Sequence, residues 1–252
     1  MIAPEAPCEP LPWDSAFFGV GIARVRDTHV GLDRLEAAVA WAEHESVACL
    51  YLLADDGDAV TRTAAESAGF ELMERRVTLM RPIAAEDRQP RIDPAVRPAR
   101  AADLPALEAL ARRSHRNTRF HRDPRFDRAR ADEMYAVWIA RSVAGELADA
   151  TWVLELEARA LEARPLGYLA ASFAGAVGAI GLVAVDASLR GKGYGRRLVE
   201  HAVQWTASRG GTRVEVVTPA LDGDATGFYE RSGFAVSRVQ FWYHRWSVGR
   251  HA

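Results

Sequence analysis

The chain has 252 residues, enough for one large domain or two small ones, and 49% of them are hydrophobic, which suffices for a buried core. A net charge of -2 and a pI of about 6.4 give no general electrostatic reason to expect nucleic acid or a membrane as partner. The two cysteines, Cys8 and Cys49, fit neither a disulfide framework nor a metal motif. The charge therefore favours a small molecule as ligand, and the cysteines give no reason to expect a metal. No basic region precedes an apolar stretch near the N-terminus, so we expect a cytoplasmic protein.

The first part of the chain is predicted to alternate between helices and strands. The spacing of its apolar residues gives the following elements: a helix over 32–44, a strand over 48–53, a helix over 59–68 and a strand over 70–80. The fold class that we expect is α/β (α+β) with a mixed, twisted sheet, because the same alternation continues through the rest of the chain.

The chain also resembles itself at a constant offset of 164 residues. The identities include these pairs: Trp41 with Trp205, Gly69 with Gly233, and Phe70 with Phe234. We therefore interpret residues 1–90 as a smaller α/β domain that is a degenerate partial copy of the second half. The copy lacks two candidate functional residues, since His29 matches Gly193 and Ala65 matches Tyr229. The alternative is chance agreement between two alanine-rich segments.

Residues 91–252 are predicted to form the second domain. The preceding stretch, 81–98, contains four prolines and several charges and is typical of a linker. The predicted elements, in order, are a strand near Val96, a helix capped by Asp103 with Pro105 in its first turn, a helix over 130–144, strands over 151–157, 165–172 and 177–185, a helix over 194–208, a strand over 212–218, a helix over 223–231 and a strand over 235–245.

One uncharged run, residues 166–185, is long enough to cross a bilayer. Four glycines and Ser172 weaken a helix there, and Ala174-Gly175-Ala176 fits a turn. We therefore predict two buried strands joined by a hairpin instead of a membrane span.

A glycine-rich turn follows the second of these strands and leads into a helix. Its glycines let the backbone approach a ligand, and the free N–H groups of a helix start favour an anion such as pyrophosphate. The spacing fits neither the P-loop nor the Rossmann turn. A tight turn whose glycines serve packing alone is the alternative. The predicted cofactor-binding residues here are Val183, Val185, Arg190, Gly191, Lys192, Gly193, Tyr194 and Gly195.

The pattern of Arg190, Gly193 and Gly195 resembles the coenzyme-A-binding motif Arg/Gln-x-x-Gly-x-Gly/Ala of the GCN5-related N-acetyltransferase (GNAT) family. The resemblance implies the fold of that family and an N-acetyltransferase that uses acetyl-CoA as co-substrate to acetylate a primary amine. It also implies that the backbone of Val183 and Val185 holds the pantetheine arm.

The segment from Asp222 to Phe234 is similar to a second element of the family, Asn-x-x-Ala-x-x-x-Tyr-x-x-x-Gly-Phe. Asp222 replaces the usual asparagine and, as a carboxylate, only accepts hydrogen bonds; we still assign it to cofactor binding. Tyr229 is the expected general acid for the departing thiolate. A half-buried packing tyrosine is the alternative. No general base stands out, and His121, Glu155 and Glu157 are weak candidates.

Residues 112–126 combine arginines and histidines with two phenylalanines. Such a segment could bind phosphates and stack a base, although a solvated arginine-rich loop has the same composition.

Further blocks resemble the branch of the GNAT family that acts on dTDP-linked amino-deoxysugars. They begin with Trp-Asp-x-x-Phe-Phe-Gly and continue with Arg-Phe and Tyr-x-x-Trp. They imply these acceptor-binding residues: Trp13, Phe17, Phe18, Arg119, Phe120, His121, Tyr135 and Trp138. A dTDP-amino-deoxysugar is therefore the favoured acceptor.

Two other functions remain open from the sequence. One is acylation of an amino acid, antibiotic, polyamine or protein lysine, and the other is acyl-CoA binding without catalysis. A homodimer also stays open, as does packing of residues 1–90 against another subunit.

Overall fold

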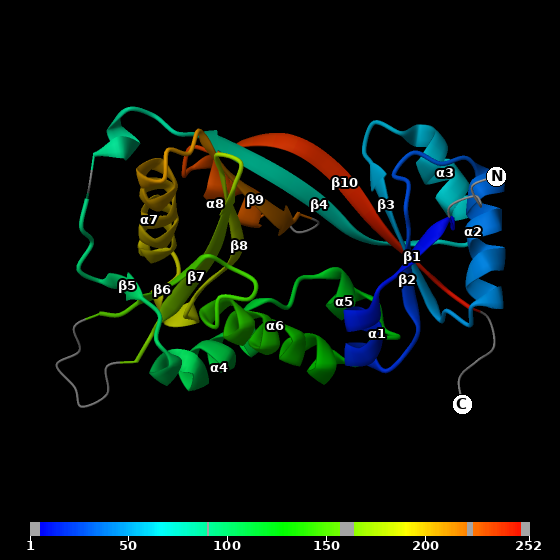
Figure 1. Ribbon diagram of the computed structural model, residues 1–252, viewed down its shortest axis with the longest axis horizontal. Coiled ribbons are helices and arrows are strands. Elements are labelled where there is room, and N and C mark those ends of the chain that lie inside the picture. The colour runs from blue at the N-terminus through cyan, green and yellow to red at the C-terminus, as the bar shows by residue number, and fades with distance from the viewer. Residues whose placement is uncertain (1–5, 90, 157–163, 221–223, 248–252) are drawn as a thin grey trace.

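The computed structural model describes residues 6–89, 91–156, 164–220 and 224–247. Within them one sheet has the strand order β1-β2-β3-β10-β4-β9-β8-β7-β6-β5 (Figure 1). Parallel pairs join β2 with β3 and β8 with β9, and the other neighbours are antiparallel. The strands are β1 (Cys8–Pro10), β2 (Ile22–Val25), β3 (Cys49–Asp55), β4 (Glu71–Pro82), β5 (Val96–Pro98), β6 (Ala150–Leu154), β7 (Gly167–Ala174), β8 (Val177–Val185), β9 (Arg213–Pro219) and β10 (Ala235–Trp246).

Helices cover both faces of this sheet. The α-helices are α1 (Pro12–Phe18), α2 (Leu32–His44), α3 (Ala59–Ser67), α4 (Leu104–Ser114), α5 (Arg119–Arg122), α6 (Arg128–Val143), α7 (Tyr194–Ser208) and α8 (Asp224–Glu230). We call the face covered by α1, α4, α5 and α6 face A, and the face covered by α2, α3, α7 and α8 face B. Figure 1 shows α4 and α6 on one side of β6–β9 and α7 on the other.

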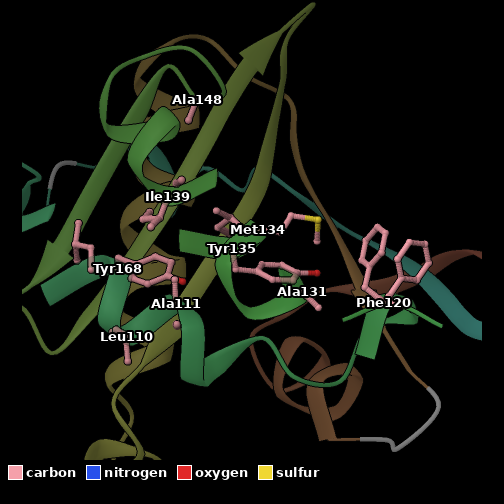
Figure 2. Packing of buried hydrophobic residues seen from close by; sticks show 14 of the residues in the cluster. Leu110, Ala111, Phe120, Ala131, Met134, Tyr135, Ile139, Ala148 and Tyr168 are labelled. Atoms are coloured by element: carbon pink, nitrogen blue, oxygen red, sulfur yellow. The ribbon is translucent and has the colours of Figure 1, made fainter. Parts of the chain in front are cut away.

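Each face has its own core. On face A, side chains of α4–α6 pack against strand residues that include Ile22, Tyr51 and Leu182. Figure 2 shows part of this cluster, with Tyr135 of α6 and Tyr168 of β7 among its largest rings. On face B, the apolar stripes of α2 and α7 face separate clusters over the two halves of the sheet. The mixed α/β sheet confirms the predicted fold class.

The two longest strands, β4 and β10, tie the halves of the chain together. They pair with one another, and β10 also pairs with β3 while β4 pairs with β9. The last strand of each half therefore lies inside the sheet of the other half (Figure 1). At the centre of this crossing Arg76 pairs with Gln240, which follows it by 164 residues.

Element bounds also recur at the offset of 164. The bounds of β9 and β10 are those of β3 and β4 moved by this number, and α2 and α7 end at equivalent residues, His44 and Ser208. The parallel pair β2–β3 matches β8–β9. These bounds agree with a duplicated unit, and the division into residues 1–90 and 91–252 remains a proposal.

The linker expected over 81–98 is fixed to the rest of the fold. β4 extends to Pro82. Arg81 makes an ion pair of 2.8 Å with Asp87 in the same segment and another of 2.8 Å with Glu200 of α7. Farther on, the Asp93 carboxylate binds the Arg197 guanidinium, also on α7. The described parts of this segment after β4, residues 83–89 and 91–98, therefore lie along α7, and we call them the strap.

One predicted cap is wrong. Asp103 stands at the start of α4, but its carboxylate does not cap that helix. It accepts instead from the Arg100 N–H at 2.8 Å and from the Arg97 guanidinium, because a short 3-10 turn over Ala101–Asp103 precedes α4.

The uncharged run 166–185 forms the β7–β8 hairpin, as predicted. Gly175 and Ala176 make its turn, both with positive φ. No helix within the described residues has the length and apolar character to cross a membrane.

Candidate functional site

An opening between β8 and β9 begins halfway along β8. The two strands pair from Val177–Arg213 to Ile180–Val216 and no farther, although β8 continues to Val185. A register shift beside Gly181 marks the point of separation, because Ile180 pairs with Ala171 and Leu182 pairs with Ala170 on β7. Bulges of this kind redirect a strand.

The backbone of β8 beyond the shift has hydrogen-bonding groups directed into this opening. Asp186 donates its N–H to the Leu166 carbonyl on the β7 side, at 2.8 Å. Because N–H and C=O groups alternate between the two edges of a strand, those of Val183 and Val185 are directed away from β7. The opening can therefore receive an extended chain with amide groups, such as pantetheine, as an added strand.

The turn after β8 is held in shape by Asp186. Its carboxylate accepts from the Ser188 N–H at 3.0 Å and the Ser188 hydroxyl at 2.7 Å, and it pairs with Arg113 at 2.7 Å. The Ser188 bonds, followed by that with Arg113, lower the pKa of Asp186 to about 2. The carboxylate thus stays ionised at neutral pH and fixes the start of the turn to α4.

The glycines of the turn fit the expected pyrophosphate. Gly191 and Gly193 have φ of +73° and +84°, and a Cβ at either would meet no protein atom within 4 Å. Gly193 is the N-cap residue of the fifteen-residue helix α7, and it makes no side-chain cap. At Gly195, a Cβ would lie 3.3 Å from the Phe228 ring of α8, so a small residue lets the two helices approach. The open backbone and uncapped helix start suit an anion.

Charged side chains stand beside this turn. Arg190 and Lys192 are exposed. A hollow of about 590 Å³ extends from Gly193 along α7 to the strap, and its lining mixes arginines such as Arg196 with acids such as Asp93 and Glu200. Positive charge next to the turn itself thus comes from Arg190, Lys192 and the start of α7.

Tyr229 of α8 lies in the face B core next to the opening. Its side chain is buried, with ring centroids 4.9 Å from Phe228 and 5.5 Å from Phe234. Val183 and Val185 pack against the same cluster. Burial raises the pKa of the Tyr229 phenol, so it holds its proton at neutral pH. Its expected partner in the motif, Asp222, lies outside the described residues.

The expected acceptor-binding aromatic residues come together on face A. Trp13 stacks on Phe17 at 5.0 Å and lies 6.0 Å from Trp138 of α6. Phe18 stacks on Phe120 at 5.3 Å. The segment before β2 and the α5–α6 region, which are about a hundred residues apart in sequence, therefore form one wall.

Tyr135 and His121 are fixed within this wall. His121 contacts the Thr118 hydroxyl at 2.8 Å and the Asp132 carboxylate at 3.0 Å. Tyr135 is buried and stacks on His115 at 4.7 Å. His121 is thus occupied by two partners, which does not favour it as a base. Of the other weak candidates, Glu155 binds the Arg97 guanidinium at the β5 edge, and Glu157 lies outside the described residues.

Arg119 lies at the centre of an aromatic cage that the sequence did not predict in full. Its guanidinium carbon is 4.1 Å from the Tyr51 ring centre, 4.2 Å from that of Trp242 and 4.5 Å from that of Phe120. Its backbone N–H donates to the Glu74 carboxylate at 2.8 Å. The cage residues that the sequence did not predict are Tyr51 of β3 and Trp242 of β10, together with Glu74 of β4. Of these three, only Glu74 could have been noticed in the sequence, because a charged residue within a central strand is unusual.

A smaller hollow of about 130 Å³ lies where this wall meets the shift in β8. Trp138 and Ser142 of α6 line it together with Gly181 and Leu182 of β8. This hollow thus lies between α6 and the part of β8 at which the opening begins.

Comparisons with known proteins identify this arrangement. The model of the acetyltransferase (GNAT) family matches residues 107–234. The dTDP-fucosamine acetyltransferase of Escherichia coli O6:H1 (strain CFT073) is 31% identical over 243 residues, which cover 96% of this chain and 99% of that enzyme. A GCN5-related N-acetyltransferase from Sphaerobacter thermophilus superposes with a TM-score of 0.63 at 14% identity, over 90% of this chain and 72% of that one. A tandem GNAT protein from the clavulanic acid biosynthesis pathway superposes with a TM-score of 0.58 at 12% identity, over 92% of this chain and 77% of that one. Acetyltransferases of this family use acetyl-CoA as co-substrate, and the chain belongs to the GNAT family of N-acetyltransferases.

Proposed function

We propose that the protein transfers an acetyl group from acetyl-CoA to the primary amine of a dTDP-linked amino-deoxysugar. The observation that carries this proposal is the similarity to a dTDP-fucosamine acetyltransferase along nearly the whole of both chains. The similarity includes the N-terminal half, which supplies Trp13 and Tyr51 to face A. A shared acyl-CoA site alone would require only the second half.

In the proposed reaction, the neutral amine attacks the thioester carbonyl carbon directly. A C–N bond forms, the C–S bond breaks, and the amine loses a proton to water. Backbone N–H groups of β8 beyond Gly181 polarise the carbonyl, and Tyr229 gives its proton to the coenzyme A sulfur. The buried, protonated phenol next to the opening supports this role.

Replacing Tyr229 with Phe tests the proton donor. We expect kcat to fall about 10²- to 10⁴-fold, the usual contribution of a general acid, while the Kd for acetyl-CoA stays unchanged. Steady-state kinetics and calorimetric titration measure the two quantities. The matched control is Tyr243→Phe, which removes the hydroxyl of another buried tyrosine, on β10, and should keep full kcat. Unchanged turnover in Tyr229→Phe would show that another group, or solvent, protonates the thiolate.

The acceptor is tested with a panel of amines. Purified protein is incubated with acetyl-CoA and with dTDP-4-amino-4,6-dideoxy-sugars, amino acids, polyamines and lysine peptides, and thiol release and product mass are followed. Preferred acetylation of the dTDP-linked sugar supports the proposal. Preferred acetylation of another amine would assign that class instead, and acetyl-CoA binding without any transfer would favour a binding module.

We also propose that residues 1–90 are a degenerate GNAT copy that no longer binds a nucleotide. At the position of Gly193 stands His29, which pairs with Asp58 at 2.8 Å. At the position of Tyr229 stands Ala65, which is fully buried. The first half has thus lost both the open turn and the phenol, and its proposed role is to build the acceptor wall.

A further inference from the structure

A polar stripe crosses the middle of face A on β4. Val77 and Leu79 of this strand are fully buried in the face B core, so the alternate residues Glu74, Arg76 and Thr78 belong to face A. Glu74 confirms this direction, because its carboxylate accepts the N–H of Arg119 on α5. Arg76 therefore lies on the same face as the Arg119 cage, two residues beyond Glu74 on β4 and paired with Pro219 of β9.

The two arginines of this region lie near acids without pairing with them, because the charge of Glu74 acts on both and that of Asp14 acts on Arg119. Glu74 is buried and accepts from the backbone of Arg119, and Arg76 donates to the neutral side chain of Gln240 on β10. Neither guanidinium has an ion pair among the described contacts. The next arginine on this face, Arg238, differs because it makes two bonds of 2.9 and 2.8 Å to Asp55.

The Arg119 guanidinium has a buried nitrogen without a partner in the described part of the chain. Nη1 of Arg119 has no hydrogen-bond acceptor within the described residues, and the Tyr51 hydroxyl beside the cage also has none. An unpaired buried donor, particularly a charged one, is costly. Burial lowers the pKa of Arg76, and the neighbouring Arg238 and Arg119 add to this effect against the opposing charge of Glu74. Each arginine thus gains from a further anionic partner on this face.

The stripe lies beside the strand that borders the opening. Arg76 pairs with Pro219 of β9, and the other edge of β9 borders the opening beyond Ile180. One strand therefore separates the stripe from the opening. An acceptor whose phosphate end is held at the stripe can extend its amine across β9 toward the opening.

We propose that Arg76 and Arg119 form the subsite that binds the diphosphate of the acceptor, a nucleoside-diphosphate-linked amino-sugar. The inference rests on the proposed function, which supplies the acceptor class. Arg76 and Glu74 come from the N-terminal half, so that half contributes a charged recognition group as well as aromatic packing. Glu74 acts as a positioning residue, because it holds the backbone of Arg119.

The kinetic test is Arg76→Gln. We expect KM for the dTDP-amino-sugar to rise about tenfold to a hundredfold, the effect of losing a charge-assisted contact, with kcat and the KM for acetyl-CoA unchanged. The same amino-sugar without a phosphate should be acetylated equally by both proteins. Arg238→Gln is the matched control, because it removes a paired arginine from the same face, and its KM should stay at the wild-type value. An Arg76→Gln variant with wild-type KM overturns the subsite.

A binding measurement separates this proposal from the acceptor assignment. dTDP is titrated by calorimetry into the whole protein saturated with coenzyme A, so that the glycine turn is already filled. Wild type should bind dTDP, and both Arg76→Gln and Arg119→Lys should bind it at least tenfold more weakly. Binding lost in the variants supports the subsite even if no dTDP-sugar is acetylated, whereas acetylation of the sugar with no effect of Arg76→Gln would retain the function and reject the subsite.

Discussion

At the scale of single residues, two histidines on face A are held by specific partners: His244 is fully buried and His115 is half-buried. His244 of β10 contacts the buried Asp123 carboxylate at 2.8 Å, and Trp246 donates to the same oxygen at 2.7 Å. His115 contacts the Tyr168 hydroxyl at 2.7 Å. Asp123 thereby fixes the end of α5 to the last strand, β10, and this contact helps to hold the Arg119 cage in place.

The burial of these histidines predicts acid lability. Burial lowers the pKa of His244 from 6.5 to about 4, although the bond to Asp123 opposes the shift and Arg119 and Arg125 reinforce it. Burial, with a smaller effect of His121, lowers the pKa of His115 to about 4 as well. A histidine whose pKa is depressed in the folded protein binds its proton at a higher pH in the unfolded chain than in the folded protein. The free energy of unfolding should therefore fall as the pH drops from 6.5 to 4, by about 3 kcal/mol for the fully buried His244 and by less for the half-buried His115.

Urea unfolding between pH 7.5 and 4.5 measures this slope. His244→Gln should make it shallower, whereas His44→Gln, which changes an exposed histidine on α2, should leave it unchanged. Stability that does not change over this range in the wild-type protein would contradict neutral, buried histidines.

At the scale of elements, the turn between β8 and α7 carries the most specific local chemistry. Gly193 has φ of +84° and open space around its Cβ position, so Gly193→Ala adds strain of roughly 1–2 kcal/mol without a clash in the protein. It also places a methyl group where the backbone meets the pyrophosphate. We expect the KM for acetyl-CoA to rise about tenfold or more.

Gly210→Ala is the control for backbone strain. Gly210 has φ of +77° and equally open surroundings, but it follows the C-terminal end of α7. Both variants should lose similar stability in thermal unfolding, and only Gly193→Ala should bind acetyl-CoA weakly. Equal KM values in the two variants would mean that the turn does not hold the pyrophosphate.

The same elements show how far local pattern predicts structure. β8 and α7 have the predicted bounds, because a continuous apolar strand and a glycine turn are local signals. The carboxylate of Asp103 deviates from its predicted cap because a 3-10 turn and Arg97 compete for it. The sequence also grouped Trp13, Phe17 and Phe18 with Phe120 and Trp138 through the family resemblance.

The Arg119 cage could not be predicted from local sequence patterns. Tyr51, Glu74 and Trp242 reach Arg119 only because β10 lies between β3 and β4. No spacing in the sequence encodes that order, since the partners are separated by more than forty to more than one hundred residues. The missed residues are therefore those that depend on long-range strand pairing.

At the scale of the whole molecule, the exchange of strands makes the two halves interdependent. β10 pairs only with β3 and β4 among the described strands, and both of these precede the strap. A chain that starts at Pro94 keeps the glycine turn and Tyr229, but its β10 has no neighbour and β9 loses one edge. Unpaired backbone groups and an exposed apolar strand destabilise such a fragment and favour aggregation.

We therefore expect residues 94–252 alone to lack a cooperative thermal transition and acetyltransferase activity. Mixing them with residues 1–93 should restore both, because the second piece returns β3 and β4 to the sheet and Arg76 to the acceptor face. Circular dichroism during heating and thiol release from acetyl-CoA measure the two recoveries. The reconstituted pair is the control for chain cleavage, since it differs from the full chain only by one peptide bond. A fragment 94–252 with full activity toward the acceptor would remove any role of the first half in the site and would leave β4 a dispensable strand.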